Sequence, residues 1–218
     1  IAHGTITVVA DGEAVEVTTF RRDVATDGRR AVVAFTHNME EDARRRDFTL
    51  NALYADRSGR VLDPLGGLPD LHARRIRFID KAADRIREDR LRVLRFFRFH
   101  AWYGGGRDLD PEGLAAAAAA AKDLAALSRE RVGTEFRRLL AAPDPSMAVE
   151  AMAKAGVLEA TLPGADGATL PALLALEKGE GIEPRWERRL AALLDRDAQD
   201  LLRLSNAEAR RLARILQA

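Results

Sequence analysis

The first third of the chain has the alternation of apolar and polar residues that is typical of β-strands. Residues 5–10 and 14–21 are rich in Val, Thr and Ile, and the ADGE stretch between them is a turn signal, so a β-hairpin is predicted here. Residues 26–35 are expected to form a glycine-containing loop that leads into a short apolar segment. A short helix is predicted next, with Thr36 or Asn38 as its capping residue and acidic residues in its first turn.

The pattern becomes helical from Asp80 onward. A long amphipathic helix is predicted from about Ala82 to Tyr103, where three glycines end it. Asp110 and Pro111 have the order of a capping residue and a first-turn proline, and they open an alanine-rich helix. The predicted fold class is therefore α+β, a β-containing unit followed by an all-α remainder, with the boundary between residues 64 and 80. Further helices are expected over residues 129–141, 144–155, 168–178, 184–195 and 205–217.

The composition limits the class of protein. A chain of 218 residues with 47% hydrophobic and 32% charged residues can bury a sizeable core. Its longest apolar run, residues 114–121, is too short to span a membrane, and no membrane partner is expected. The absence of cysteine excludes disulfides and thiolate metal sites and fits a cytoplasmic location, and the four histidines have no metal-ligand spacing.

Positive charge is concentrated in one segment, although the net charge of the chain is only +1. Residues 71–107 contain eleven Lys and Arg against four Asp and Glu, and such a basic stripe is a candidate surface for phosphate groups. Within it, the stretch EDRLRVLRFFRFH places Glu88, Arg92 and Arg95 on one side of a continuous helix, with Asp89 within reach of Arg92. A solvated face with intrahelical ion pairs is the alternative interpretation.

An aspartate and an arginine side by side could select a base. Cytosine and adenine each offer an amino donor beside an acceptor nitrogen, whereas uracil and guanine reverse that pattern. A carboxylate that accepts from the amino group and a guanidinium that donates to the ring nitrogen would therefore select C and A together. Asp89 and Arg92 are the candidate pair.

A second group of charged residues precedes the apolar segment FTLNALYAD. Arg45 and Arg46 are candidate cations for phosphate or ribose, and Asp47 is a carboxylate that could orient one of them. The alternative is the polar end of a helix. Trp102 and Tyr103 also leave two interpretations, base stacking or packing.

Four motifs occur in an order that resembles the class II tRNA nucleotidyltransferases and the related bacterial poly(A) polymerases. They span roughly residues 3–140 and are HGTITV with VEVTTFRRDV and TDGRR, RRDFTLNALYAD with DPLGGLPDL, IREDRLRVLRFFRF, and SRERVGTEFRRLL. The resemblance implies the C-terminal part of a polymerase β-like nucleotidyltransferase head, followed by a helical neck and a helical body. The corresponding domains are residues 1–64, 65–107 and 108–218.

The resemblance also implies a set of nucleotide-binding residues. Arg45, Arg46 and Asp47 match the motif that recognises the ribose and phosphates of the incoming nucleotide. Glu88, Asp89 and Arg92 match the motif whose Asp and Arg serve as an amino-acid template for C or A.

Two further arginines of the same stretch, Arg95 and Arg98, are expected to contact phosphate or to brace the template.

One further residue and three further segments match features of the family. Glu16 matches a position proposed as the third carboxylate of the active site, and it is the one catalytic residue expected here. Residues 27–35 match a flexible loop linked to the switch from C to A addition. Residues 63–71 match a hinge-like motif between head and neck, and residues 128–140 resemble the helix that braces the template.

The activity implied by the resemblance is template-independent addition of CCA to tRNA 3′ ends from CTP and ATP, with Mg²⁺ as cofactor of the intact protein. The Gly-Gly-x-Val-Arg-Asp segment and the Asp-x-Asp pair that bind two magnesium ions in this family would precede His3, and the sequence does not contain them. Because the chain starts at Ile1 without Met, it is expected to be part of a longer protein and inactive by itself, with no metal site within it.

Three alternatives remain open on the sequence alone. A bacterial poly(A) polymerase would use the same chemistry on messenger RNA, although the paired phenylalanines of EDRLRVLRFFRF favour the CCA-adding branch. An enzyme that adds only CC is the second alternative, since that distinction lies in residues 27–35. The third is a non-catalytic RNA-binding module. The tRNA contacts of the body and the oligomeric state are not predicted.

Overall fold

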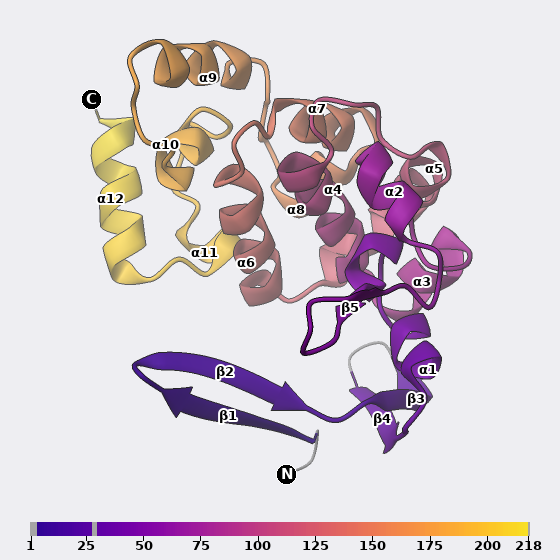
Figure 1. The fold of residues 1–218 in the computed structure, drawn as a ribbon. Helices are drawn as coiled ribbons and strands as arrows, with labels where there is room; N and C mark the ends of the chain where they lie inside the picture. The colour runs from indigo at the N-terminus through magenta and orange to yellow at the C-terminus, as the bar shows by residue number, and fades with distance from the viewer. Residues whose placement is uncertain (1–3, 28–29, 218) are drawn as a thin grey trace.

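The computed structural model describes residues 4–27 and 30–217, and it has two β-hairpins beside a body of helices (Figure 1). β1 (Thr5–Ala10) and β2 (Glu13–Thr18) pair antiparallel, which confirms the predicted hairpin. Asp11 and Gly12 turn the chain between them with φ angles of 52° and 82°, and two positive values of this kind are what a type I′ turn requires. The turn sequence therefore fixes the pairing of the two strands.

Residues 26–35 do not form the predicted loop. β3 (Arg21–Asp27) and β4 (Arg30–Phe35) form a second antiparallel hairpin, and residues 28–29 between them lie outside the described residues. The β-branched and apolar residues of RAVVAF favour a strand, and pairing with β3 satisfies their backbone groups. The predicted role of this segment in switching from C to A falls partly on the residues outside the description and stays a prediction.

A short helix connects the hairpins to the helical body. α1 (Met39–Arg44) is capped by Asn38, whose Oδ1 accepts from the Glu40 N–H at 2.9 Å, so the second of the two predicted caps is confirmed. The chain then forms a 3₁₀ turn and a small antiparallel sheet, which are η1 (Thr49–Ala52), β5 (Tyr54–Ala55) and β6 (Val61–Leu62).

The rest of the chain is helical, as predicted. Three helices of four to six residues, α2, α8 and α11, were not predicted, because fewer than two turns leave no periodic pattern to detect. None of the described helices is long and apolar enough to cross a membrane. In chain order the elements are α2 (Leu68–Ala73), α3 (Ala82–Glu88), α4 (Leu91–Tyr103), α5 (Pro111–Ala120), η2 (Ala121–Ala126), α6 (Arg129–Leu140), α7 (Ser146–Lys154), α8 (Val157–Thr161), α9 (Leu170–Gly179), α10 (Trp186–Ala191), α11 (Gln199–Leu202) and α12 (Asn206–Leu216).

The long helix predicted over residues 82–103 is in fact two helices. α3 ends at Glu88 and α4 begins at Leu91, because Asp89 is extended, with φ −150° and ψ 107°. The Asp89 carbonyl accepts from the Arg92 N–H and its Oδ1 accepts from the Leu91 N–H, both at 3.0 Å, as a residue that caps a helix start does. The prediction of one continuous helix, with Glu88 on the same side as Arg92 and Arg95, was therefore wrong in its geometry, although Glu88 does pair with Arg92.

An aromatic cluster joins the two parts of the chain. Phe96 and Phe97 on the apolar side of α4 are buried, and Phe96 stacks on Phe78 with ring centroids 5.5 Å apart. Phe48, from the segment after α1, packs on Phe78 at 4.9 Å. One buried core therefore runs from Phe48 to Leu212, and the division into domains at residues 64 and 107 stays a prediction.

α6 approaches α11 so closely at Gly133 that a side chain does not fit. A carbon added there would lie 2.0 Å from the backbone oxygen of Leu202. We predict that Gly133→Ala lowers the free energy of unfolding by about 1–3 kcal/mol, although alanine is about 1 kcal/mol better than glycine within a helix. Urea denaturation measures the change. Gly179→Ala is the matched control, because nothing lies within 4 Å of the added carbon, and an equal loss in both variants would contradict the close approach.

Candidate functional site

Six of the predicted site residues line one open pocket, where the end of α1 meets the starts of α4 and α6. The pocket has a volume of about 290 Å³. Five arginines against two aspartates give it an excess of positive charge, which suits an anionic ligand. The lining residues are Arg45, Arg46, Asp47, Asn51, Asp89, Leu91, Arg92, Arg95 and Arg131.

Asp42 on α1 orients the first two arginines of the pocket. Arg45 and Arg46 follow it by three and four residues, so the three side chains meet on one side of the helix end. Asp42 Oδ1 accepts from Arg45 Nη2 at 2.7 Å, and Oδ2 accepts from Arg46 Nη2 at 3.1 Å. The Tyr54 hydroxyl and the Arg21 N–H donate to the same carboxylate, at 2.8 and 3.2 Å. Donors from four residues thus hold one buried acid and, with it, both guanidinium groups.

The same donors determine the charge of Asp42. Burial alone would raise the pKa of its carboxyl, but hydrogen bonds from Arg45, Tyr54 and Arg21 outweigh burial and lower the pKa to about 2. Burial and the bond to Asp42 raise the pKa of Tyr54 to about 12, so its hydroxyl remains a donor at neutral pH. The sequence motif indicated Asp47 as the carboxylate that orients an arginine. The helical spacing of three and four residues to Arg45 and Arg46 would have identified Asp42 instead.

Asp47 instead pairs with Arg95 across the pocket. The buried carboxylate accepts from Arg95 Nε, and it also accepts from Asn51 Nδ2 and the Phe48 N–H, both at 3.0 Å. Burial would raise the pKa of Asp47, but the charge and hydrogen bond of Arg95, together with the hydrogen bonds from Asn51 and the Phe48 N–H, outweigh burial, so its pKa lies below the ordinary value. This pair joins the segment after α1 to α4. Asn51, which the sequence motifs did not single out, is part of it.

Arg92 is fixed by three acceptors. Its Nη1 donates to the Glu88 carboxylate and to the Arg85 carbonyl, and its Nη2 donates to the Arg45 carbonyl at 3.2 Å. Arg85 Nη2 donates in the same way to the Arg46 carbonyl, at 3.0 Å. Carbonyl groups at the end of a helix lack intrahelical partners, so these two arginines satisfy the end of α1 and dock it on α3 and α4.

Asp89 faces the pocket from the break between α3 and α4. Its Oδ1 accepts from the Leu91 N–H, and its Oδ2 accepts from Nη2 of Arg131 on α6. A carboxylate oxygen has more than one lone pair, so Asp89 retains capacity to accept from a ligand. Asp89 and Arg92, the candidate pair, line the same pocket without pairing with each other: Asp89 pairs with Arg131 and Arg92 pairs with Glu88. Arg131 lies 42 residues from Asp89, and no local pattern marks it.

Three predicted site residues lie outside the pocket. Glu88 holds Arg92 and lines a neighbouring hollow of about 300 Å³ between α3 and the start of α6. Arg98 is buried and pairs with Glu135 of α6 at 3.1 Å, an arrangement that fits bracing and not phosphate contact. Glu16 is exposed on the hairpin of β1 and β2. The ligand roles assigned to these residues, and to the six in the pocket, stay predictions.

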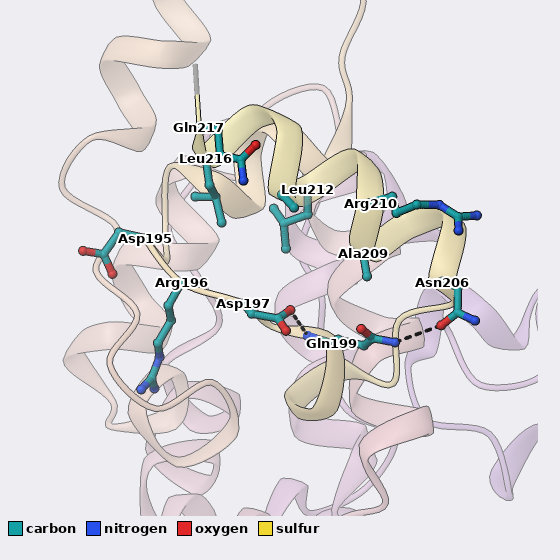
Figure 2. Close-up of a pocket in the computed structure, with 11 residues that line it drawn as sticks. Asp195, Arg196, Asp197, Gln199, Asn206, Ala209, Arg210, Leu212, Leu216 and Gln217 are labelled. Atoms are coloured by element: carbon teal, nitrogen blue, oxygen red, sulfur yellow. Dashed lines mark hydrogen bonds between the residues drawn. The ribbon is translucent and has the colours of Figure 1, made fainter.

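A second pocket, of about 530 Å³, lies on the other side of the helical body. Figure 2 shows that its lining residues come from α12 and from the segment around α11, with Leu212 and Leu216 on its α12 side. Gln199 Nε2 donates to Asn206 Oδ1 at 3.1 Å and links the two helices there. None of its lining residues belongs to the sequence motifs, so the arginine-lined pocket is the candidate site.

The carboxylates of the described residues do not gather into a metal site. Within residues 4–27 and 30–217, no group of three or more His, Asp or Glu side chains has an arrangement that could hold a metal ion. The acids of the pocket are used differently, since Asp47 and Asp89 each pair with an arginine. The remaining excess of positive charge in the pocket suits an anionic ligand.

Two family models match segments of this chain. A model described as "Poly A polymerase head domain" matches residues 1–77, and one described as "Probable RNA and SrmB- binding site of polymerase A" matches residues 108–168. A CCA-adding enzyme of Streptococcus gordonii is 39% identical over 227 residues, which cover 100% of this chain and 56% of that protein. Human CCA tRNA nucleotidyltransferase 1, mitochondrial, is 44% identical over 144 residues, which cover 63% of this chain and 32% of the human protein.

Solved structures have the same fold. The crystal structure of Bacillus stearothermophilus CCA-adding enzyme in complex with CTP matches with a TM-score of 0.77 and 35% identity, over 99% of this chain and 54% of that one. A Thermotoga maritima CCA-adding enzyme complexed with tRNA_CCA matches in fold, with a TM-score of 0.69 at 18% identity, over 98% of this chain and 53% of that one. The chain thus spans about half of the length of these solved relatives.

The fold is α+β, as predicted, and it contains the nucleotidyltransferase head features and the helices that follow them. The chain belongs to the family of tRNA nucleotidyltransferases and poly(A) polymerases, which its motifs had indicated.

Asp42→Asn is expected to weaken the fold in a pH-dependent way. The folded-state pKa of about 2 lies below the ordinary 3.8, so the stabilisation is fully present above pH 3.8 and is lost as the pH falls toward 2. We predict a loss of about 2 kcal/mol in the free energy of unfolding at neutral pH, shrinking as the pH falls below 3.8. Urea unfolding at a series of pH values measures the difference between the two proteins.

The matched control for this prediction is Asp84→Asn. Asp84 is exposed and pairs with Arg87 on the surface of α3, so its loss should cost less than about 1 kcal/mol at any pH. A difference between the parent protein and Asp42→Asn that stays constant down to acidic pH would contradict the low pKa.

Proposed function

We propose that this chain is the nucleotide-selecting and RNA-binding part of an enzyme that adds CCA to tRNA 3′ ends from CTP and ATP, without a nucleic-acid template. The observation that carries the proposal is the pocket in which Asp89 and Arg92 lie beside Arg45 and Arg46. The Bacillus relative, 35% identical, is a complex with CTP, which supports a cytidine nucleotide as a ligand. The names of the curated relatives support tRNA as the other substrate.

Base selection is assigned to Asp89 and Arg92. The carboxylate would accept from the exocyclic amino group of cytosine or adenine, and the guanidinium would donate to the adjacent ring nitrogen. Both groups are held before a nucleotide arrives, Asp89 by Arg131 and Arg92 by Glu88 and the Arg45 carbonyl. Such preorganisation lowers the cost of binding, and it lets two side chains replace a template base. Uracil or guanine would place a carbonyl oxygen opposite the carboxylate and a ring N–H opposite the guanidinium, and neither pairing forms a hydrogen bond.

Arg45, Arg46 and Asp47 are proposed to bind the ribose and phosphates. A guanidinium has five N–H donors, so Arg45 and Arg46 retain donors for phosphate oxygens beyond those that Asp42 accepts. Arg95, paired with Asp47, adds a further cation to the same pocket.

The catalytic metals of the proposed reaction are not assigned to residues of this chain. The family uses divalent metal ions, and Mg²⁺ is proposed for the whole protein, but the described residues offer no ligand set for it. Glu16 is the carboxylate proposed to contribute to catalysis. The chain by itself is therefore proposed to bind a nucleotide without transferring it.

The arrangement of domains belongs to the same proposal. Residues 1–64 would be the end of the head, residues 65–107 the neck and residues 108–218 the body. The body would hold the tRNA acceptor arm, which the RNA-binding description of the family model over residues 108–168 supports. An enzyme that uses tRNA, CTP and ATP would meet them in the cytoplasm.

The test of this function uses the full-length protein, a tRNA that ends at the discriminator base, and labelled CTP and ATP. Growth by three nucleotides supports CCA addition. Growth by two nucleotides in the presence of ATP, or a long A tail on any RNA, would replace the proposal with CC-only or poly(A) addition. Binding without any growth would leave an RNA-binding module. The 218-residue chain, assayed beside it, tests whether the chain alone is inactive.

Asp89→Asn is expected to relax base selection. The asparagine amide can donate as well as accept, so it can pair with a carbonyl of uracil and still accept from the Leu91 N–H. We predict that the preference for CTP over UTP falls about tenfold or more, which corresponds to a base contact worth about 1–3 kcal/mol. Single-turnover incorporation into tRNA with each nucleotide measures the ratio. Asp84→Asn should leave the ratio unchanged, and unchanged selection in Asp89→Asn would remove the role assigned to Asp89.

A further inference from the structure

A group of aromatic and cationic side chains lies at the C-terminal half of α4, outside the nucleotide pocket. It lines an open hollow of about 280 Å³. Trp102 and Tyr103 are 43% and 51% exposed, which is unusual for large rings in a chain that buries most of its phenylalanines. We call this group the aromatic surface, and its members are Arg98, Phe99, Trp102 and Tyr103 of α4 and Arg138 of α6.

The exposed rings are held in place although they are not covered. Trp102 Nε1 donates to the Arg138 carbonyl at 2.7 Å, which fixes the indole against α6 while leaving much of it in solvent. Tyr103 packs on Phe99 with ring centroids 5.6 Å apart. A ring that is already fixed loses little conformational entropy when a ligand stacks on it. The arrangement is therefore that of a preformed stacking platform.

The aromatic surface is also positively charged. The guanidinium of Arg98 lies 4.8 Å from the Phe99 ring centroid, and that of Arg95 lies 5.5 Å from it. Arg138 is exposed beside them on α6. Arg98 and Arg95 each pair with an acid, Glu135 and Asp47, so the exposed Arg138 is the cation placed to meet a phosphate. An exposed cation beside exposed rings is the combination that binds single-stranded nucleic acid, because the rings stack on bases and the cation attracts a phosphate.

The aromatic surface continues directly from the nucleotide pocket. Arg95, Arg98, Phe99, Trp102 and Tyr103 are spaced by three or four residues, so they share one face of α4. Arg95 lines the nucleotide pocket, and the rise of the helix places Tyr103 about 12 Å further along. Within this surface, Trp102 and Tyr103 are exposed, whereas Arg98 is buried and Phe99 packs against the core.

We propose that the aromatic surface binds the unpaired 3′-terminal nucleotides of the RNA that is to be extended, by stacking on Trp102 and Tyr103. An incoming nucleotide and the RNA end that receives it must lie side by side, and α4 provides adjoining places for both. The inference rests on the proposed function only in identifying the RNA as a primer. A surface that is covered by another protein segment is the competing interpretation, and the experiment below separates the two.

The test measures RNA binding by the full-length protein without CTP or ATP. One probe is a tRNA that ends in CC, which has an unpaired 3′ end, and the other is the same tRNA trimmed to a fully paired acceptor end. We expect Trp102→Ala to raise the Kd for the first probe about tenfold, the size of one lost stacking contact, and to leave the second unchanged. Trp102→Phe keeps a ring and should stay within threefold of the parent protein for both probes.

Two further variants keep the test valid if Trp102→Ala folds poorly. Arg138→Gln preserves the backbone carbonyl that holds Trp102, and it should reduce the slope of log Kd against log salt by about 0.7, as expected for one lost contact to a single-strand phosphate. Leu176→Ala removes a 62%-exposed apolar side chain from α9 and is the matched control, with no expected effect on either probe.

Two results would overturn the inference. One is an unchanged Kd in Trp102→Ala, and the other is an equal rise in Kd for both probes. If that equal rise comes with a fall in melting temperature, the surface is one that another protein segment covers. A failure of the proposed function is distinguishable, because the Kd for CTP and the nucleotides added are measured separately. If the protein adds only A yet Trp102→Ala binds the unpaired end tenfold more weakly, the inference stands and CCA addition does not.

Discussion

The arginine-lined pocket depends on the ion pair between the buried Asp47 and the partly exposed Arg95. One partner comes from the segment after α1 and the other from α4, so the pair sets the separation between the two walls of the pocket. Burying the Asp47 carboxylate carries a desolvation cost, which is offset because the partly exposed Arg95 lies close to it and Asn51 and the Phe48 N–H also donate to the acid. Phe48 and Phe96 pack beneath it, with ring centroids 6.4 Å apart.

Arginine has two distinct tasks in this chain. Some arginines face the pocket or the aromatic surface, but others complete the ends of helices. Arg85 and Arg92 donate to carbonyls at the end of α1, and the buried Arg189 donates to the carbonyls of Leu140 and Ala142 at the end of α6. Part of the positive charge is therefore used inside the protein, and the density of arginine along a segment overstates the charge that a ligand meets.

Site residues that belong to a sequence motif could be predicted from the sequence. Site residues that only tertiary contacts bring to the pocket could not. Arg45, Arg46 and Asp89 stand within motifs and do line the pocket. The break at Asp89 could not be predicted, because the flanking residues favour a helix and the break is held by local hydrogen bonds. Arg131 comes from a different helix. Asp42 was accessible to prediction, since its spacing to two arginines is a helical one, but the adjacent Asp47 was the more obvious carboxylate.

The break between α3 and α4 has a consequence for the redesign of this protein. Asp89 accepts the Leu91 N–H at the start of α4, so the residue there must be short and must carry an acceptor oxygen. Only Asp, Asn, Ser and Thr meet this demand, and of these only Asp and Asn also have a second polar atom to present to a ligand. The number of usable side chains is thus limited by folding before specificity is considered. A laboratory search for new nucleotide preferences would therefore find more freedom at Arg131, whose side chain has no capping role.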